Sequence, residues 1–188
     1  MKGVSEIISY ILIVSLVVSL VSFILSWGLP YLQKQQDEVK NSLIFNDLFS
    51  ENSPNSLANK LRKVIFSKTT EKVGGYDGNW NVAQKNITFS FISKASPVNP
   101  SQDWVSIYGC TKESCIFPME PFYEVKVSSE RIDNYFLVKY RLELKKIVIN
   151  DKTYEILFEN PIDLNTKQIT ISFSKIDESN GKIFLVVR

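Results

Sequence analysis

The sequence contains no histidine and only two cysteines among its 188 residues. Histidine is the usual general base near neutral pH and the commonest metal ligand in proteins. Its absence excludes Ser-His-Asp and Cys-His catalysis and every zinc site that needs a histidine ligand. We therefore predict a protein that is not an enzyme and that holds no cofactor and no metal. Catalysis by carboxylates or by lysine is the enzymatic alternative that the composition leaves open.

The sequence also lacks a large excess of either sign of charge. It has 22 Lys and Arg residues and 20 Asp and Glu residues, a formal net charge of +2. The chain has no basic block, no acidic tail and no low-complexity tract, so we expect no nucleic-acid partner. P-loop, G-x-G-x-x-G and EF-hand motifs are missing as well. The cluster Gly74-Gly75-x-x-Gly78 lacks the Lys-Ser/Thr that a phosphate-binding loop needs.

One segment without any charge runs from Ile7 to Leu32, and most of its positions are Ile, Leu, Val or Phe. At about 1.5 Å per residue, a helix of this length exceeds the roughly 30 Å hydrocarbon core of a bilayer. A buried helix of a globular protein is the alternative, but such helices rarely stay uncharged for so long. The segment therefore predicts a single-pass membrane anchor.

The end of this segment carries aromatic and helix-bending residues. Trp27 and Tyr31 are placed as an interfacial aromatic belt. Gly28 and Pro30 predict a local bend, because proline removes a helical hydrogen bond. The helix is expected to continue beyond this bend to about Phe49.

Four serines within the segment fall on one narrow helical face: Ser15, Ser19, Ser22 and Ser26. Small residues on one face let two helices approach closely where lipid surrounds them. The alternative is that each hydroxyl bonds back to the carbonyl of the preceding turn. The spacing leaves both interpretations open.

Glu6 places a carboxylate at the edge of the apolar segment, four residues after Lys2. A charge against an apolar span indicates a functional role. The alternatives are an ion pair with Lys2, a position among the lipid headgroups or a favourable interaction with the helix dipole.

The N-terminal residues Lys2-Gly3-Val4-Ser5-Glu6-Ile7-Ile8, followed at once by the apolar segment, resemble the start of archaeal type IV pilins and pilin-like proteins. In this family a very short class III signal peptide ends in a basic residue and glycine. A prepilin-type peptidase cuts before the hydrophobic segment. The resemblance implies a cut between Gly3 and Val4, so that residues 1–3 are the signal and residues 4–50 form the retained helix with its extension.

The same resemblance implies a function. The helix would first hold the subunit in the membrane and then pack with copies of itself, or with other pilin-like subunits, as the core of a filament. The serine face would contact neighbouring subunits, and Glu6 would neutralise a mature N-terminal amine. Many archaeal members have proline at this position, so Glu6 departs from the family pattern. The head would lie outside the cytoplasm, at the cell surface or in a filament.

Residues 51–188 are predicted to form this extracytoplasmic head. Helical spacing, carried by Val39 and Leu43 among others, ends at the Ser-Glu-Asn-Ser-Pro stretch 50–54. An amphipathic helix over residues 56–66 follows, packing on a sheet or lying on a membrane surface.

Alternation with a period of two then predicts short strands. The expected strands are 87–92, 104–108, 123–127, 135–144, 147–149, 154–158, 169–173 and 183–187. Hairpin turns are expected at Asn150-Asp151 and Asn180-Gly181. The fold class is therefore α+β, a long hydrophobic helix followed by an antiparallel β-sandwich-like head. The β-sandwich heads common among archaeal pilins agree with this.

Two further sites are predicted in the head. Cys110 and Cys115 favour a local disulfide if the head is exported, with two free thiols as the alternative. Closing so short a loop stabilises by only about 2 kcal/mol. Asn86-Ile87-Thr88 is the one N-x-[ST] triplet, so Asn86 is a candidate glycosylation site, although such triplets often arise by chance.

We carry two functional hypotheses forward from the sequence. The first is a pilin-like filament subunit or a minor component of such an assembly. The second is a membrane-tethered β-domain that does not polymerise and acts as a binding or accessory module.

Overall fold

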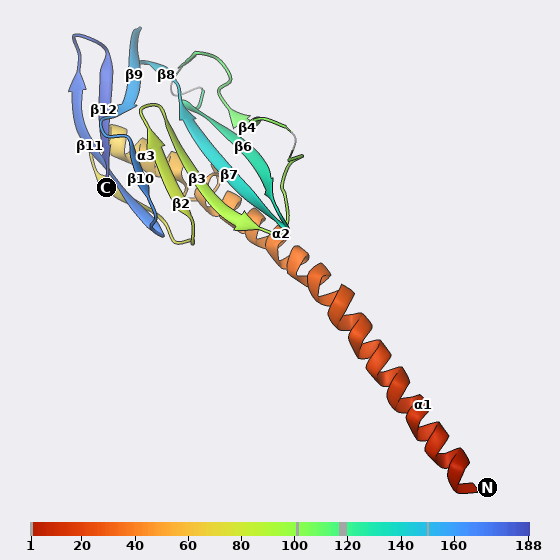
Figure 1. Ribbon diagram of the computed structural model, residues 1–188. Coiled ribbons are helices and arrows are strands. Elements are labelled where there is room, and N and C mark those ends of the chain that lie inside the picture. The colour runs from red at the N-terminus through yellow and green to blue at the C-terminus, as the bar shows by residue number, and fades with distance from the viewer. Residues whose placement is uncertain (1, 101, 117–119, 150) are drawn as a thin grey trace.

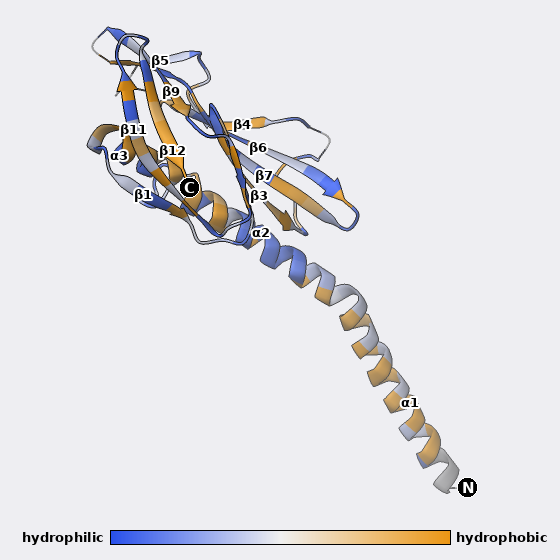
Figure 2. Cartoon of the chain, turned by 60° about the vertical axis from the view of Figure 1, so that its left-hand side comes forward, coloured by the Kyte–Doolittle hydropathy of each residue, from blue (hydrophilic) through white to orange (hydrophobic). Residues whose placement is uncertain are grey.

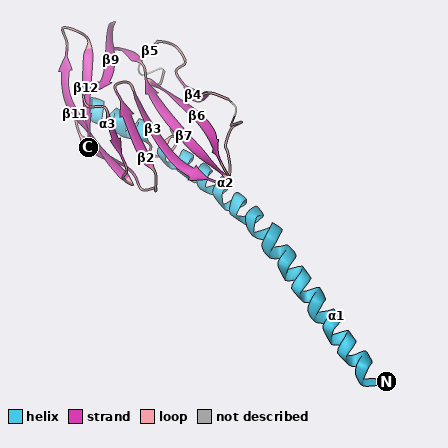
Figure 3. Cartoon of the chain, in the orientation of Figure 1, coloured by secondary structure: helices cyan, strands magenta, loops and turns pink. Residues whose placement is uncertain are grey.

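The computed structural model describes residues 2–100, 102–116, 120–149 and 151–188 and consists of a long helical rod joined to a β-rich head (Figure 1). The rod is built from α1 (Lys2–Phe23), a π-helical turn η1 (Ile24–Gly28) and α2 (Leu29–Leu48). Figure 3 shows these three elements as one uninterrupted helix that projects away from the strands. The predicted α+β architecture is confirmed.

The head contains two six-stranded sheets. In the first, the strand order is β1-β11-β12-β9-β8-β5, and in the second it is β10-β2-β3-β7-β6-β4. The strands of the first sheet are β1 (Thr70–Gly74), β5 (Ser114–Ile116), β8 (Lys146–Ile149), β9 (Lys152–Phe158), β11 (Gln168–Asp177) and β12 (Lys182–Val187). Those of the second are β2 (Asn79–Ala83), β3 (Asn86–Ser93), β4 (Val105–Gly109), β6 (Tyr123–Ile132), β7 (Tyr135–Leu144) and β10 (Ile162–Leu164).

Most neighbouring strands pair antiparallel, as the alternating sequence pattern predicts, but β9 with β12 and β5 with β8 pair parallel. The turn at Asn180-Gly181 is confirmed, since Gly181 has φ 59° and joins the antiparallel strands β11 and β12. Asp151 has φ 61° between β8 and β9, whereas Asn150 lies outside the described residues. Positive φ is what a tight hairpin requires at such positions.

Inward-facing side chains of both sheets form one core. The long strand β7 shows why, because Val138, Tyr140 and Leu142 are buried at every second position while the residues between them are only partly covered. The two sheets therefore bury one face each, as sandwiches do.

Helix α3 (Leu57–Ser67) packs on the first sheet against β1 and β11. Ser56 caps its start, since its hydroxyl accepts a hydrogen bond of 3.3 Å from the backbone N–H of Asn59. Leu57, Leu61 and Val64 are fully buried. The predicted amphipathic helix is thus confirmed, and its apolar face covers a sheet within the head.

The C-terminal half of α2 is also part of the head core. Ile44, Leu48 and Phe49 are buried with both sheets, whereas Val39 and Leu43, on which the predicted helix extension rested, are 60% and 57% exposed. The predicted extension of the helix to about residue 49 is confirmed. The face of it that contacts the head is the one that carries Ile44 and Leu48, and not the one that carries Val39 and Leu43. Because the helix does not end at the head boundary, rod and head share one element.

Candidate functional site

The exposed apolar half of the rod is the most unusual surface of the protein. Large apolar side chains between Ile7 and Leu32 are 45% to 76% exposed. The helix spanning Glu6–Leu48 contains an 18-residue window of mean hydropathy 2.7, and none of that window is buried in the protein. Figure 2 shows this apolar surface along α1, giving way to polar residues where α2 nears the head. Among the described residues the protein therefore has one helix long and apolar enough to cross a membrane, and it lies near the N-terminus.

Gly28 and Pro30 do not break this helix. Leu29 donates its backbone N–H to the carbonyl of Ile24, five residues earlier, so that the chain widens into a single π-helical turn. Pro30 has no N–H to donate, and its ring crowds the carbonyl four residues before it. The π-turn accommodates this crowding while the helix continues.

Trp27 lies at the centre of an aromatic ladder along the rod. Its ring stacks 6.0 Å from that of Phe23 and 6.1 Å from that of Tyr31. All three occupy successive turns near the end of the apolar segment, which is where aromatic belts meet lipid headgroups.

The four serines of the predicted stripe are all exposed. Ser19 donates its hydroxyl to the carbonyl of Ser15 at 2.8 Å, and Ser26 donates to the carbonyl of Phe23 at 3.2 Å. Back-bonding of this kind satisfies the hydroxyl in an apolar environment. Because serine side chains are short, a neighbouring helix can also approach closely at these positions. The geometry is therefore compatible both with a helix-packing face and with hydroxyls that only bond within the helix.

The predicted processing site lies at the start of α1. The backbone of Gly3 and Val4 is helical, while the side chains of residues 2–5 lie outside the description. Glu6 is exposed at this end of the rod and pairs with no described side chain.

A junction of polar and apolar contacts fixes α2 to the second sheet. Lys94, directly after β3, donates its backbone N–H to Asp37 Oδ2 at 2.6 Å, and its ammonium group is hydrogen-bonded to Gln33 Oε1. One turn further along, Asn41 donates from Nδ2 to the carbonyl of Ala95 at 2.9 Å. Successive turns of α2 therefore hold the same segment of the head.

Aromatic packing continues the junction into the core. Tyr140 of β7 is nearly fully buried, with its ring centroid 5.6 Å from that of Phe45 and 5.3 Å from that of Phe49. Burial raises the pKa of Tyr140 to about 12, so this phenol stays neutral at physiological pH. It acts as a packing group with a polar tip.

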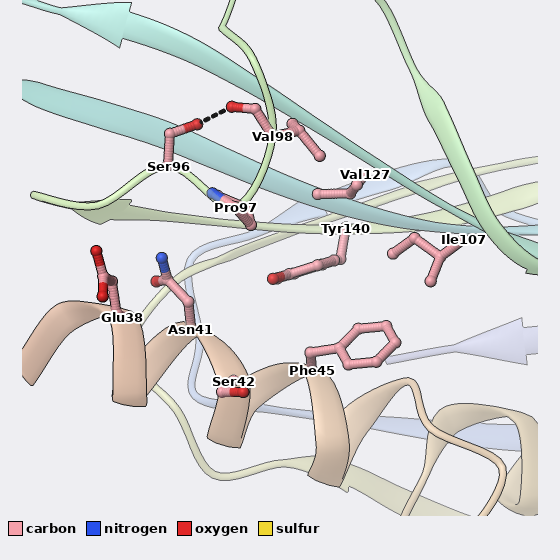
Figure 4. A pocket seen from close by; sticks show the side chains of 10 residues that line it. All are labelled: Glu38, Asn41, Ser42, Phe45, Ser96, Pro97, Val98, Ile107, Val127 and Tyr140. Carbon is pink, nitrogen blue, oxygen red and sulfur yellow. Dashed lines mark hydrogen bonds between the residues drawn. The ribbon is translucent and has the colours of Figure 1, made fainter. Parts of the chain in front are cut away.

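A groove of about 420 Å³ opens beside this junction (Figure 4). Phe45 and Asn41 of α2 form one wall, and Val127, Tyr140 and the 96–98 segment form the other. Asn41 Oδ1 is buried without a hydrogen-bond partner among the described residues. The groove offers apolar contact and a buried acceptor, Asn41 Oδ1, and among its lining residues we find no close pair of titratable groups for acid–base catalysis.

The outer face of the second sheet carries a network of charged side chains. Glu124 is 5% exposed and accepts from the ammonium groups of Lys145 at 2.9 Å and Lys126 at 3.3 Å. Burial alone would raise the pKa of this carboxyl, but the hydrogen bonds from the two lysines and Ser106 outweigh it and lower the pKa. The network satisfies a buried charge and thereby holds β4, β6 and the end of β7 together.

A second groove, of about 510 Å³, lies on the same outer face, nearer the β6–β7 hairpin. There the guanidinium of Arg141 stacks 3.8 Å from the ring of Trp104 and donates from Nε to Thr88 Oγ1 at 3.3 Å. Trp80, the other tryptophan of the head, is fully buried in the core.

The disulfide between Cys110 and Cys115 is present, with 6.4 Å between its Cα atoms. It closes the loop between β4 and β5. Glu120 offers a carboxylate oxygen within 4.8 Å of both sulfurs, but bonded sulfurs supply no thiolate for a metal.

Asn86 is the first residue of β3, directly after the tight β2–β3 turn, and is half-buried. The third residue of its triplet, Thr88, is buried beneath Arg141. Glycosylation of Asn86 stays a prediction.

No protein-family model, curated protein or solved structure matches this chain.

Proposed function

We propose that this chain is a pilin-like subunit. It is processed by a prepilin-type peptidase, anchors in the membrane, and assembles through its N-terminal helix into a type IV pilus-like surface filament or complex. One observation carries the proposal. A fully exposed apolar helix continues without a linker into the core of the head, so that one rigid element serves both.

This continuity favours a subunit over a tether. A tethered module needs only a flexible linker, because its binding does not depend on the angle between head and anchor. An ordered array needs every head at the same angle to its helix. The contacts of Gln33, Asp37 and Asn41 with residues 94–95 supply that constraint.

The apolar surface of the rod supports the same conclusion. Such a surface is unstable in water and must be covered by lipid or by other helices. The serine stripe lets a neighbouring helix approach closely while Ser19 and Ser26 keep their hydroxyls bonded within the helix. One helix can thus serve first in lipid and later in a helical core.

Processing provides the direct test. We expect the mature protein, purified from its native membrane or filament, to begin at Val4, because the peptidase would cut after Gly3. Intact-mass spectrometry would detect the loss of three residues. Gly3→Leu should block cleavage and leave the chain in the membrane fraction.

A matched control is Ser5→Ala, which changes a small residue on the other side of the bond and should be processed normally. A mature chain that keeps Met1, or one cut after Trp27, would contradict the proposal.

Assembly tests the serine stripe separately. Ser19→Leu and Ser22→Leu each place a branched side chain where a neighbouring helix would approach, so filament or oligomer yield should fall several-fold. Val17→Leu, on the opposite face of the same exposed helix, should have little effect. Electron microscopy of sheared cells would count filaments. Normal assembly of both serine variants would show that the stripe is not an interface.

The alternative of a non-polymerising binding module has one observation in its favour. The groove beside α2 is mostly apolar and contains Asn41 Oδ1, a buried acceptor with no partner in the part of the chain that the structure describes, and small-ligand sites combine these features. Normal membrane localisation combined with no assembly under any condition would favour this alternative.

A further inference from the structure

The outer face of the second sheet changes from polar to apolar at one end. Strand register defines the rows across this face. The polar rows are Thr88–Arg141–Lys126 and Ser90–Lys139–Ser128. The next rows towards the β6–β7 hairpin are Ile92–Leu137–Glu130 and Tyr135–Ile132.

We define the tip patch as Ile92, Ile132, Tyr135 and Leu137. Ile92 is 61% exposed, and Ile132 and Tyr135 are each 45% exposed. All four side chains face the same side of the sheet, because outward positions alternate along each strand. They therefore form a partly exposed apolar surface, and the ammonium group of Lys94 lies over its Tyr135 ring.

The tip patch lies at the level where the apolar part of the rod ends. Lys94 establishes this, because its ammonium group lies 5.7 Å from the ring centroid of Tyr135 and is also bonded to Gln33. Gln33 directly follows Leu32, the last residue of the uncharged segment. In Figure 1 the ends of β3, β6 and β7 lie beside the start of α2, at the end of the head that faces α1.

We propose that the tip patch rests on the surface of the lipid bilayer from which the helix emerges. Through Lys94 the patch is joined to Gln33, at the same end of the apolar segment as the stacked rings of Trp27 and Tyr31. Tyrosine is enriched at membrane–water interfaces. The charges around the patch are balanced, with Arg131 and Lys94 against Glu130 and Asp133, so the apolar side chains carry the proposal.

The consequence is a second contact between the subunit and the membrane. The head would be seated on the bilayer by the β6–β7 hairpin as well as by its helix. This inference rests on the helix spanning a membrane and is independent of polymerisation.

The test uses the full chain in nanodiscs of phosphatidylcholine and phosphatidylglycerol, with isoleucine δ1 methyl groups labelled for NMR. Nitroxide carried on lipid headgroups should broaden the methyl signals of Ile92 and Ile132 several-fold more than that of Ile176. A water-soluble gadolinium chelate should act in the reverse order. Ile176 is the matched control, because it is 40% exposed and lies near the β11–β12 turn at the opposite end of the head.

A double variant of the tip patch provides a second test. Ile132→Asp combined with Tyr135→Asp should remove the lipid-dependent broadening at Ile92, while methyl groups of α1 remain broadened and the head spectrum is otherwise preserved. Equal broadening of Ile92, Ile132 and Ile176 would overturn the proposal. Protection of the patch that appears only with two chains in one disc would also overturn it and assign the patch to contact between copies.

Discussion

A flexible insert between Leu32 and Gln33 should abolish filament formation while membrane insertion and head folding remain intact. A short Gly-Ser segment at this point separates the apolar rod from the first residue that contacts the head, Gln33. Glycine and serine linkers behave as flexible coils. The head would still be anchored but would no longer hold a defined angle to the helix. Negative-stain electron microscopy, membrane fractionation and thermal unfolding of the solubilised protein would measure the three properties.

The same Gly-Ser segment added after Arg188 is the control, since it adds identical residues without interrupting the helix. This variant should assemble normally. Filaments of normal number and diameter from the interrupted chain would show that rigid coupling between rod and head is unnecessary. The continuity of the apolar helix with the head core would then no longer support the proposed function.

Leu48→Ala should lower the free energy of unfolding of the head by about 2–5 kcal/mol, the range for deleting a buried leucine side chain. Leu48 is 1% exposed, at the last turn of α2, within the core shared by both sheets. Removing its side chain leaves a cavity that the surrounding strands can fill only in part. Denaturant unfolding of the full chain in detergent, followed by tryptophan fluorescence, would measure the loss.

Leu43→Ala is the matched control, because it is the same substitution in the same helix at a residue 57% exposed. It should change stability by no more than about 0.5 kcal/mol, as surface substitutions usually do. Equal losses from the two variants would mean that α2 does not contribute its observed face to the head core.

The two predictions concern one helix with two separate tasks. Its first part presents apolar surface to lipid or to other helices, and its last turns stabilise the head. Stability and head orientation are therefore coupled through α2. A substitution at the junction can impair assembly without touching the apolar segment, for example at Asn41, whose amide holds the Ala95 carbonyl.

Local patterns were sufficient to predict several elements. The uncharged run Ile7–Leu32, the amphipathic spacing of 57–65 and the alternation in β3, β6 and β7 are each set by neighbours in sequence. The Cys110–Cys115 bridge joins residues five apart, so it too required no knowledge of the fold. Strands β1, β2, β5 and β10 were not predicted, because each is short and holds at most two large apolar residues, too few to show an alternating pattern.

The sequence pattern did not predict which face of α2 contacts the head. Val39 and Leu43 are more apolar than Asn41, yet Asn41 is the buried residue. Burial of an amide is favourable only where a partner exists, and here the carbonyl of Ala95, 54 residues later, supplies it. No periodicity in the helix itself carries that information.

The sequence by itself determined that a charge-free helix long enough to cross a bilayer precedes a β-rich domain, because hydropathy and periodicity are local properties. The three-dimensional structure alone decided which face of this helix enters the head core, since that depends on contacts with Lys94, Ala95 and Tyr140. It also decided that Ile92, Ile132 and Tyr135 meet on one surface, because strand register joins residues that lie far apart in the chain.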